Sequence, residues 1–216
     1  MLANNLSNTG TAGFKADREF NGLFQDQLPV VDRAWTDFSQ GVTVPNGNPL
    51  NLALSGKGFF ALNTPTGTVY TRNGDFSLSK SNQLQTSEGY TLRNVLDNGK
   101  PITVDPSQSI DIAKDGTVQQ GGQTIGQIEI DQVPSSEDVL SKLGNSYFAL
   151  ASGSPASAAT QDTQVLQGSL EQSNVPAADA AVRLVSVMRQ FEMMQKAMTI
   201  GSAMDKAAIQ EVAKVG

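Results

Sequence analysis

Residues 174–201 have the sequence NVPAADAAVRLVSVMRQFEMMQKAMTIG, in which apolar side chains recur at alternating intervals of four and three. The pattern consists of Ala180, Leu184, Val187, Phe191, Met194, Met198 and Gly201, and its phase continues through Asp205, Ala208, Val212 and Val215. This seven-residue period is typical of an α-helix that packs against another helix in a coiled coil. Asn174 is expected to cap the helix, Pro176 to occupy its first turn, and Asp179 to complement its dipole.

An amphipathic helix that lies on the protein's own core would show the same apolar stripe. However, about 40 residues at 1.5 Å per residue form a helix of roughly 60 Å, which exceeds the width of a small domain. Much of the stripe is therefore expected to contact something beyond the rest of the chain.

The middle of the chain consists of short β-prone segments separated by Gly, Asn and Asp turns. The expected strands are 51–54, 59–63, 68–72, 76–79, 83–86, 90–93, 110–112 and 128–131, followed by a last strand or extended return at 165–170. Positive φ is expected at the hairpin turns Asn73-Gly74, Asn98-Gly99 and Asp115-Gly116. The sequence thus predicts a mainly β body, an antiparallel sandwich or partly open barrel, followed by a long coiled-coil-type α-helix.

The segments around this body have other compositions. Residues 2–11 are polar and rich in Asn, which predicts a helix end and a turn. Residues 17–40 are predicted to form a short helix and then an extended connector, and residues 152–163 a linker or exposed loop. The predicted organisation is an N-terminal motif and connector at residues 1–47, a β-rich body at 48–165, and a C-terminal return with the long helix at 166–216.

The composition argues against several classes of function. The chain of 216 residues contains no Cys and no His, so thiolate metal sites, disulfides and His or Cys catalysis are excluded. Its net charge is −6 and it has no run of Lys or Arg, so nucleic acid is not an expected partner. It also lacks an apolar stretch long enough to span a bilayer, so no direct membrane insertion is expected. No catalytic residue, cofactor, metal or small-molecule substrate is assigned.

Six stretches along the chain are similar to motifs of the flagellar rod and hook family. They are Ala-Asn-Asn-Leu-Ser-Asn with Gly-Phe-Lys within residues 3–15, Asn-Leu-Ala-Leu-Ser-Gly-Lys-Gly-Phe-Phe at 51–60, Tyr-Thr-Arg-Asn-Gly-Asp-Phe at 70–76, Leu-x-Thr-x-x-Gly-Tyr at 84–90, Gly-x-Leu-Glu-x-Ser-Asn-Val at 168–175, and Arg-x-Phe-Glu-Met at 189–193. The resemblance covers nearly the whole chain, and the motifs at its two ends occur in the order that the family shows.

The resemblance implies a structural subunit rather than an enzyme, with other rod subunits and further copies of itself as partners. In this family the terminal helices associate as the core of a tube, and the β body lies outside. The implied location is the periplasm-spanning rod of the flagellar basal body, reached by export without a cleaved signal peptide. The resemblance marks as the assembly interface Asn4, Asn5, Leu6, Asn8, Thr11, Gly13, Phe14, Glu171, Ser173, Asn174, Val175, Leu184, Val187, Arg189, Phe191, Glu192, Met194 and Met198.

The chain differs from the family pattern in the lengths of its middle segments and in its N-terminal segment. The short central region argues against the hook protein, and the short connector before the sheet favours the proximal over the distal type of rod subunit. Family members have a further helix before the motif at residues 3–15, so the chain is expected to be shortened at its N-terminus. The C-terminal helix would then either borrow a partner from a neighbouring copy or be poorly ordered.

Two readings outside the family stay open on the residues alone. One is a secreted β-rich enzyme, in which two of the 21 acidic residues would converge as in a glycosidase. The other is a surface adhesion or carbohydrate-binding module. Acidic residues scattered over turns and strands more commonly face solvent.

Overall fold

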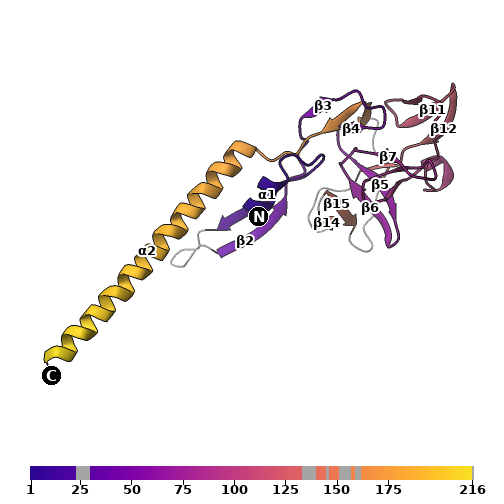
Figure 1. The fold of residues 1–216 in the computed structure, drawn as a ribbon. Helices are drawn as coiled ribbons and strands as arrows, with labels where there is room; N and C mark the ends of the chain where they lie inside the picture. Colours follow the sequence, from indigo (N-terminus) through magenta and orange to yellow (C-terminus); the bar gives the residue numbers. More distant parts are fainter. Residues whose placement is uncertain (23–29, 133–139, 145, 151–156, 159–161, 216) are drawn as a thin grey trace.

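The computed structural model describes residues 1–22, 30–132, 140–144, 146–150, 157–158 and 162–215 (Figure 1). A β body occupies one end of the molecule, and a single long helix leaves it. The prediction of a mainly β protein with a long C-terminal helix is confirmed.

The largest sheet is antiparallel and forms the centre of the body. In order across the sheet its strands are β14 (Leu140–Lys142), β15 (Tyr147–Leu150), β6 (Gly67–Thr71), β5 (Phe59–Thr64), β9 (Thr91–Leu92), β8 (Leu84–Gln85) and β7 (Ser77–Leu78), while β13 (Ile130–Gln132) pairs with β5 and β16 (Ser157–Ala158) pairs with β13. The order ends at β14 and at β7, so the described strands form an open sheet rather than a closed barrel.

Smaller antiparallel sheets surround this one. They are the sheet of β10 (Ile110–Ile112), β11 (Thr117–Gln120) and β12 (Gln123–Gln127), the pair of β4 (Leu52–Ser55) with β17 (Gln164–Gln167), the pair of β3 (Thr43–Pro45) with β18 (Ser169–Glu171), and the hairpin of β1 (Asp17–Gly22) with β2 (Val30–Thr36). A short 3-10 helix, η1 (Val95–Asp97), follows β9. Gly168, at φ +71°, separates β17 from β18, so the returning chain pairs first with β4 and then with β3.

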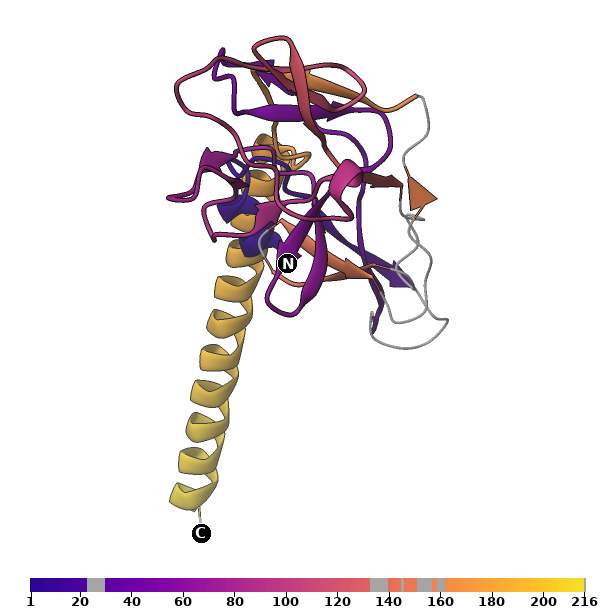
Figure 2. The ribbon, with the colours of Figure 1, turned by 90° about the vertical axis from the view of Figure 1, so that its right-hand side faces the viewer.

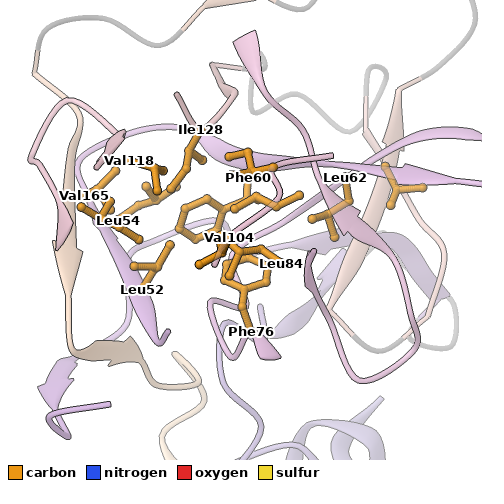
Figure 3. Close-up of a cluster of buried hydrophobic side chains, with 14 of the residues drawn as sticks. Leu52, Leu54, Phe60, Leu62, Phe76, Leu84, Val104, Val118, Ile128 and Val165 are labelled. Carbon is orange, nitrogen blue, oxygen red and sulfur yellow. The ribbon is translucent and has the colours of Figure 1, made fainter. Parts of the chain in front are cut away.

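The core of the body is formed by side chains from several of these sheets. Figure 3 shows residues of β4, β5, β8, β11 and β17 pointing toward one another, including the fully buried Leu54 and Phe60. A second cluster contains Phe38, Phe59 and Phe148, whose rings meet edge to face at centroid distances of 5.2–5.8 Å. The body thus has an apolar interior of its own that does not use the long helix.

Two helices complete the fold. The short α1 (Leu2–Ser7) opens the chain, and α2 (Ala177–Val215) closes it with 39 residues, about 58 Å at 1.5 Å per residue. Figures 1 and 2 both show α2 extending far beyond the body, with its C-terminus at the distant end.

Most sequence-predicted strands between residues 51 and 93 are confirmed to within one or two residues, as are 110–112 and the return at 165–170. The segment predicted at 128–131 begins as a strand only at Ile130. Thr117–Gln120, around Val118, form the strand β11, which the sequence did not predict. The prediction of a helix end and turn at residues 2–11 is also confirmed. The predicted loop at 152–163 lies largely outside the described residues.

The predicted short helix in residues 17–40 is wrong. Residues Asp17–Gly22 and Val30–Thr36 form the β1–β2 hairpin, in which Asp17 pairs with Thr36 and Arg18 with Trp35. The segment contains β-branched and aromatic residues that favour strands, and pairing gives its backbone groups partners that an isolated short helix could not hold.

The predicted turn conformations are confirmed only in part. Asn98, Gly99 and Gly116 have positive φ as expected, whereas Asn73, Gly74 and Asp115 do not. Gly74 is required for another reason, because a Cβ there would lie 1.6 Å from the carbonyl oxygen of Leu52.

Alkaline pH is expected to destabilise the body through Tyr70 of β6. Burial, together with the neighbouring carboxylates of Asp131 and Glu129, raises the pKa of Tyr70 to about 12. Between pH 10 and 12 the folded protein therefore keeps a proton that the unfolded chain loses, so stability falls as pH rises through this window. The loss amounts to about 2–3 kcal/mol for this residue.

Denaturant titrations of the wild type and Tyr70→Phe across pH 8–12 measure this loss. The variant should lose less stability between pH 10 and 12, because its side chain cannot ionise. Parallel pH profiles for the two proteins would show that Tyr70 does not contribute.

Candidate assembly site

The carboxylate of Glu171, at the end of β18, lies fully buried between two basic side chains. Its Oε1 accepts a hydrogen bond from Nζ of Lys15 at 2.6 Å, and its Oε2 accepts one from Nη1 of Arg72 at 3.2 Å. The backbone N–H of Gly41 also donates to Oε1, at 2.9 Å. One carboxylate therefore links the N-terminal motif, the connector, the centre of the body and the strand that leads to α2.

The two cations also bind backbone carbonyl groups. Nζ of Lys15 donates to the carbonyl oxygen of Ser39 at 2.7 Å, and Nη2 of Arg72 donates to that of Gly56 at 2.6 Å. Arg72 further lies over the ring of Phe59, 5.4 Å from its centroid. These contacts give Lys15 and Arg72 partners in addition to the carboxylate of Glu171. Such partners are needed because a buried charge is costly unless it is paired and hydrogen-bonded.

Burial lowers the pKa of both Lys15 and Arg72, because desolvation disfavours their charged forms. The charge of Glu171 and its hydrogen bonds act in the opposite direction for both side chains. The two cations thus depend on this carboxylate, because its charge and hydrogen bonds are the largest contributions that offset their desolvation.

Two glycines let the backbone segments approach this cluster. A Cβ on Gly41 would lie 2.0 Å from the carbonyl oxygen of Gln172, whose own N–H donates to the carbonyl of Val42. Gly13, at φ +66°, donates its N–H to the carbonyl of Glu171 at 2.8 Å, and a Cβ there would lie 2.3 Å from the backbone of Arg72. Both positions require a residue without a side chain.

Asn174 joins the same segments through its amide group. Its Oδ1 accepts from the backbone N–H of Ala16 at 2.8 Å, and its Nδ2 donates to the carbonyls of Asp37 and Ser39 at 2.7 and 3.0 Å. The expectation that Asn174 caps α2 is therefore wrong. The first helical carbonyl is that of Pro176, which accepts from the N–H of Ala180.

A small apolar cluster covers the start of α2. Phe14, Ala16, Val175 and Ala180 are buried together, with Leu6 of α1 packed against them. Nζ of Lys142 lies 4.2 Å from the centroid of the Phe14 ring and also binds Asp17 Oδ1 at 2.8 Å.

The asparagines of the N-terminal motif have defined local roles. The amide of Asn5 pairs with the backbone of Asp17 in both directions, at 2.7 and 3.0 Å, so it ties α1 to the start of β1. Nδ2 of Asn8 donates to Oδ1 of Asn4, and the hydroxyl of Thr11 donates to Oδ1 of Asn8. These bonds hold the turn that follows α1.

Beyond its first turns, α2 carries exposed apolar side chains. We call Leu184, Val187, Phe191, Met194 and Met198 the first seam. Leu184 is half-buried, while Phe191 is 60% exposed and Met198 69% exposed. Arg189 and Glu192 are also exposed, but they lie on the side of the helix that faces away from this seam. The helix therefore displays an apolar surface that the described part of the chain does not cover.

The structure divides the sequence-predicted assembly residues into two groups. Residues 4–14 and 171–175 meet within one chain, where Gly13, Phe14, Glu171 and Val175 are buried, and Ser173 accepts a hydrogen bond from the N–H of Val175. The residues of α2 lie apart from them along the helix. Assignment of either group to contacts between subunits stays a prediction.

The site residues predicted from the sequence do not include Lys15, Arg72, Gly41 or Lys142. Lys15 and Arg72 belong to the family motifs at residues 3–15 and 70–76. The motifs did not indicate that these two side chains bind a buried carboxylate. No spacing rule connects residues 15, 72 and 171, because only the folded chain brings them together.

The described residues contain neither a metal-type cluster nor a membrane-spanning helix. Among the described side chains, no three His, Cys, Asp or Glu residues gather as they would around a metal ion. None of the helices in the described ranges combines the length and apolar character that crossing a membrane demands.

Two family models match the chain. The model described as the flagellar hook protein FlgE/F/G D1 domain matches residues 53–120, which span much of the β body. The model described as the flagellar basal body rod FlgEFG protein C-terminal matches residues 166–211, which contain β18 and most of α2.

Curated relatives extend the similarity over nearly the whole chain. A flagellar basal-body rod protein FlgF of Caulobacter vibrioides is 27% identical, with 100% of this chain and 91% of the relative aligned. A FlgF of Mesorhizobium japonicum is 31% identical over 88% of this chain and 81% of the relative. A FlgG of Caulobacter vibrioides is 30% identical over 97% of this chain and 92% of the relative.

Replacing Glu171 by Gln is expected to destabilise the protein strongly. The substitution preserves shape but leaves Lys15 and Arg72 buried without a carboxylate, a loss of about 3–5 kcal/mol. Asp97→Asn, in the exposed pair with Lys100, is the matched acid-to-amide control and should cost less than about 1 kcal/mol. Denaturant unfolding measures both, and equal losses in the two variants would contradict the role given to Glu171.

A side chain at Gly41 is expected to disrupt the junction through crowding alone. Gly41→Ala places its Cβ against the Gln172 carbonyl and should cost at least about 1–3 kcal/mol. Gly10→Ala is the matched control, because nothing lies within 4 Å of its added Cβ. Thermal unfolding distinguishes the variants, and a Gly41→Ala protein as stable as Gly10→Ala would refute the close approach.

Proposed function

The chain belongs to the FlgE/F/G family of flagellar axial proteins, and on that premise we propose that it is a structural subunit of the flagellar basal-body rod. In this proposal the subunit has no catalytic role. Its partners are further copies of itself and other rod subunits.

The observation that carries the proposal is the exposed first seam of α2. Coiled-coil periodicity predicts a helical partner, and the described part of the chain leaves Val187, Phe191, Met194 and Met198 exposed. A monomer in water gains nothing from displaying such a stripe, whereas burial between subunits stabilises each contact through the hydrophobic effect.

The junction around Glu171 supports the same function. An assembling subunit must present its helix at a reproducible angle to its body, because each contact of a polymer repeats the one before. The buried ion cluster and the amide of Asn174 connect the start of α2 to the body through short hydrogen bonds. In our proposal residues 48–165 form the outer body, and residues 1–47 and 166–216 form the part that assembles.

The proximal rod protein FlgF is the type of subunit that we propose. Alignments with FlgG relatives run over 237–246 residues, longer than the 216 residues of this chain, so those relatives carry insertions. Two alignments with FlgF relatives run over 199 residues and one over 228. Because identities to the two types overlap at 27–31%, FlgG is the alternative.

We place the subunit in the part of the basal body that crosses the periplasm. It would reach this position through the flagellar export channel without a cleaved signal peptide. The names of the relatives, all flagellar basal-body rod proteins, support the flagellar location.

Placing a charge in the first seam is expected to abolish assembly without unfolding the body. Phe191→Asp introduces a carboxylate that cannot be buried between subunits, while the clusters around Phe60 and Phe59 lie elsewhere. Val185→Asp is the matched control, because Val185 is also exposed but lies on another side of the helix. The measurements are concentration-dependent polymerisation by sedimentation and restoration of motility in a strain that lacks the subunit.

The proposal predicts that the wild type and Val185→Asp polymerise and restore motility, and that Phe191→Asp does neither. A Phe191→Asp protein that restores full motility would contradict assembly through this seam. A wild type that hydrolyses glycans and never joins other rod proteins would instead favour the secreted enzyme.

A further inference from the structure

The methionines of this chain are concentrated on its long helix. Of the six methionines in the sequence, five lie in α2, at Met188, Met193, Met194, Met198 and Met204. All five side chains are 56–69% exposed, although methionine is among the residue types most often buried in folded proteins. Figures 1 and 2 show α2 extending clear of the body. The five thioether groups are therefore accessible to solvent in the free subunit.

Their positions around the helix divide these residues into two groups. Met194 and Met198 belong to the first seam, and they lie next to each other on one face of the helix because they are four residues apart. At about 100° per residue, Met188, Met193 and Met204 lie roughly 80–140° around the axis from the centre of that seam. Two thioethers are thus on the surface to which the proposed function assigns assembly, and three are not.

The chemistry that these groups undergo is oxidation of the sulfur. In a chain without Cys, the exposed thioethers are the side chains that a mild peroxide oxidises. Hydrogen peroxide transfers one oxygen atom to the sulfur, so its O–O bond breaks, an S–O bond forms, and water is the second product. The sulfur loses two electrons and the peroxide gains them. The product is methionine sulfoxide, which is polar where the thioether was apolar.

A sulfoxide in the first seam acts as a polar group that assembly must bury. Its oxygen is hydrated in the free subunit, and covering the seam removes that water at a cost in free energy unless a hydrogen-bond donor replaces it. The neighbouring seam residues Val187 and Phe191 are apolar and provide no donor. A sulfoxide at Met188, outside the seam, can remain hydrated and carries no such cost.

We propose that Met194 and Met198 form a peroxide-sensitive modification site that controls whether the free subunit can assemble. The inference rests on the proposed function and adds to it a reversible chemical control. Oxidation removes a subunit from the assembling population, and reduction of the sulfoxides by methionine sulfoxide reductases returns it. Subunits that have already assembled are shielded, because the seam is then covered.

Two double variants of the full-length chain test this site. Met194→Leu/Met198→Leu, the seam variant, keeps apolar side chains of similar volume that cannot form a sulfoxide. Met188→Leu/Met193→Leu is the matched control, because it removes the same number of thioethers from outside the seam. Free subunits are treated with hydrogen peroxide, their sulfoxides are located by mass spectrometry, and the concentration needed for polymerisation is measured by sedimentation after the peroxide is removed.

The expected effect is specific to the seam. After oxidation the wild type and the control variant should need a roughly tenfold or higher concentration to polymerise than before treatment. The seam variant should polymerise at the same concentration before and after treatment, although its other methionines are oxidised. Reduction of the oxidised wild type by the two sulfoxide reductases, one for each epimer, should restore its original behaviour.

Each contrary outcome has a separate meaning. The inference fails, while assembly through the first seam survives, if fully oxidised wild type polymerises like untreated protein. It also fails if oxidation impairs the seam variant as much as the control variant, or if fully reduced wild type does not recover. If untreated wild type neither polymerises nor joins other rod subunits, the proposed function fails and the inference with it. Circular dichroism verifies that α2 stays helical after oxidation.

Discussion

The buried carboxylate of Glu171 is the interaction on which the arrangement of this chain depends. Lys15 and Arg72 both donate hydrogen bonds to it, and it also accepts one from the N–H of Gly41. Removing two cations from water is costly unless a counter-charge and hydrogen bonds replace the solvent. The segments that carry these groups are therefore held together wherever the chain is folded, and the start of α2 is held with them.

This polar junction and the apolar surface of α2 have different roles. The junction is specific in direction, because charged and amide groups bond only at defined distances and angles. The first seam of α2 is less selective in geometry but provides the apolar burial that the proposed association requires. The body has its own cores around Phe60 and Phe148, so it does not need the first seam for its stability.

The elements predictable from sequence were those with a strong local pattern. The heptad period located α2, and alternating β-prone runs with Asn-Gly and Asp-Gly turns located most strands. The hairpin at residues 17–36 was missed because apolar residues at helical spacing competed with β-branched and aromatic residues, and strand pairing decided between them. The roles of Glu171 and Asn174 could not be deduced locally, since their partners lie 99–156 residues away in the sequence. Asn174 is a residue type that favours helix caps, yet its amide binds the connector instead.

Peroxide footprinting of the methionines in α2 tests the central claim most directly. Hydrogen peroxide oxidises an accessible thioether to a sulfoxide, and five exposed methionines lie along this helix in a chain without Cys. Burial of the first seam predicts that Met194 and Met198 react in the free subunit and become protected in the polymer, whereas Met188, which lies outside this seam, stays reactive. Equal oxidation of all five residues in free subunits and in polymers would contradict assembly through α2.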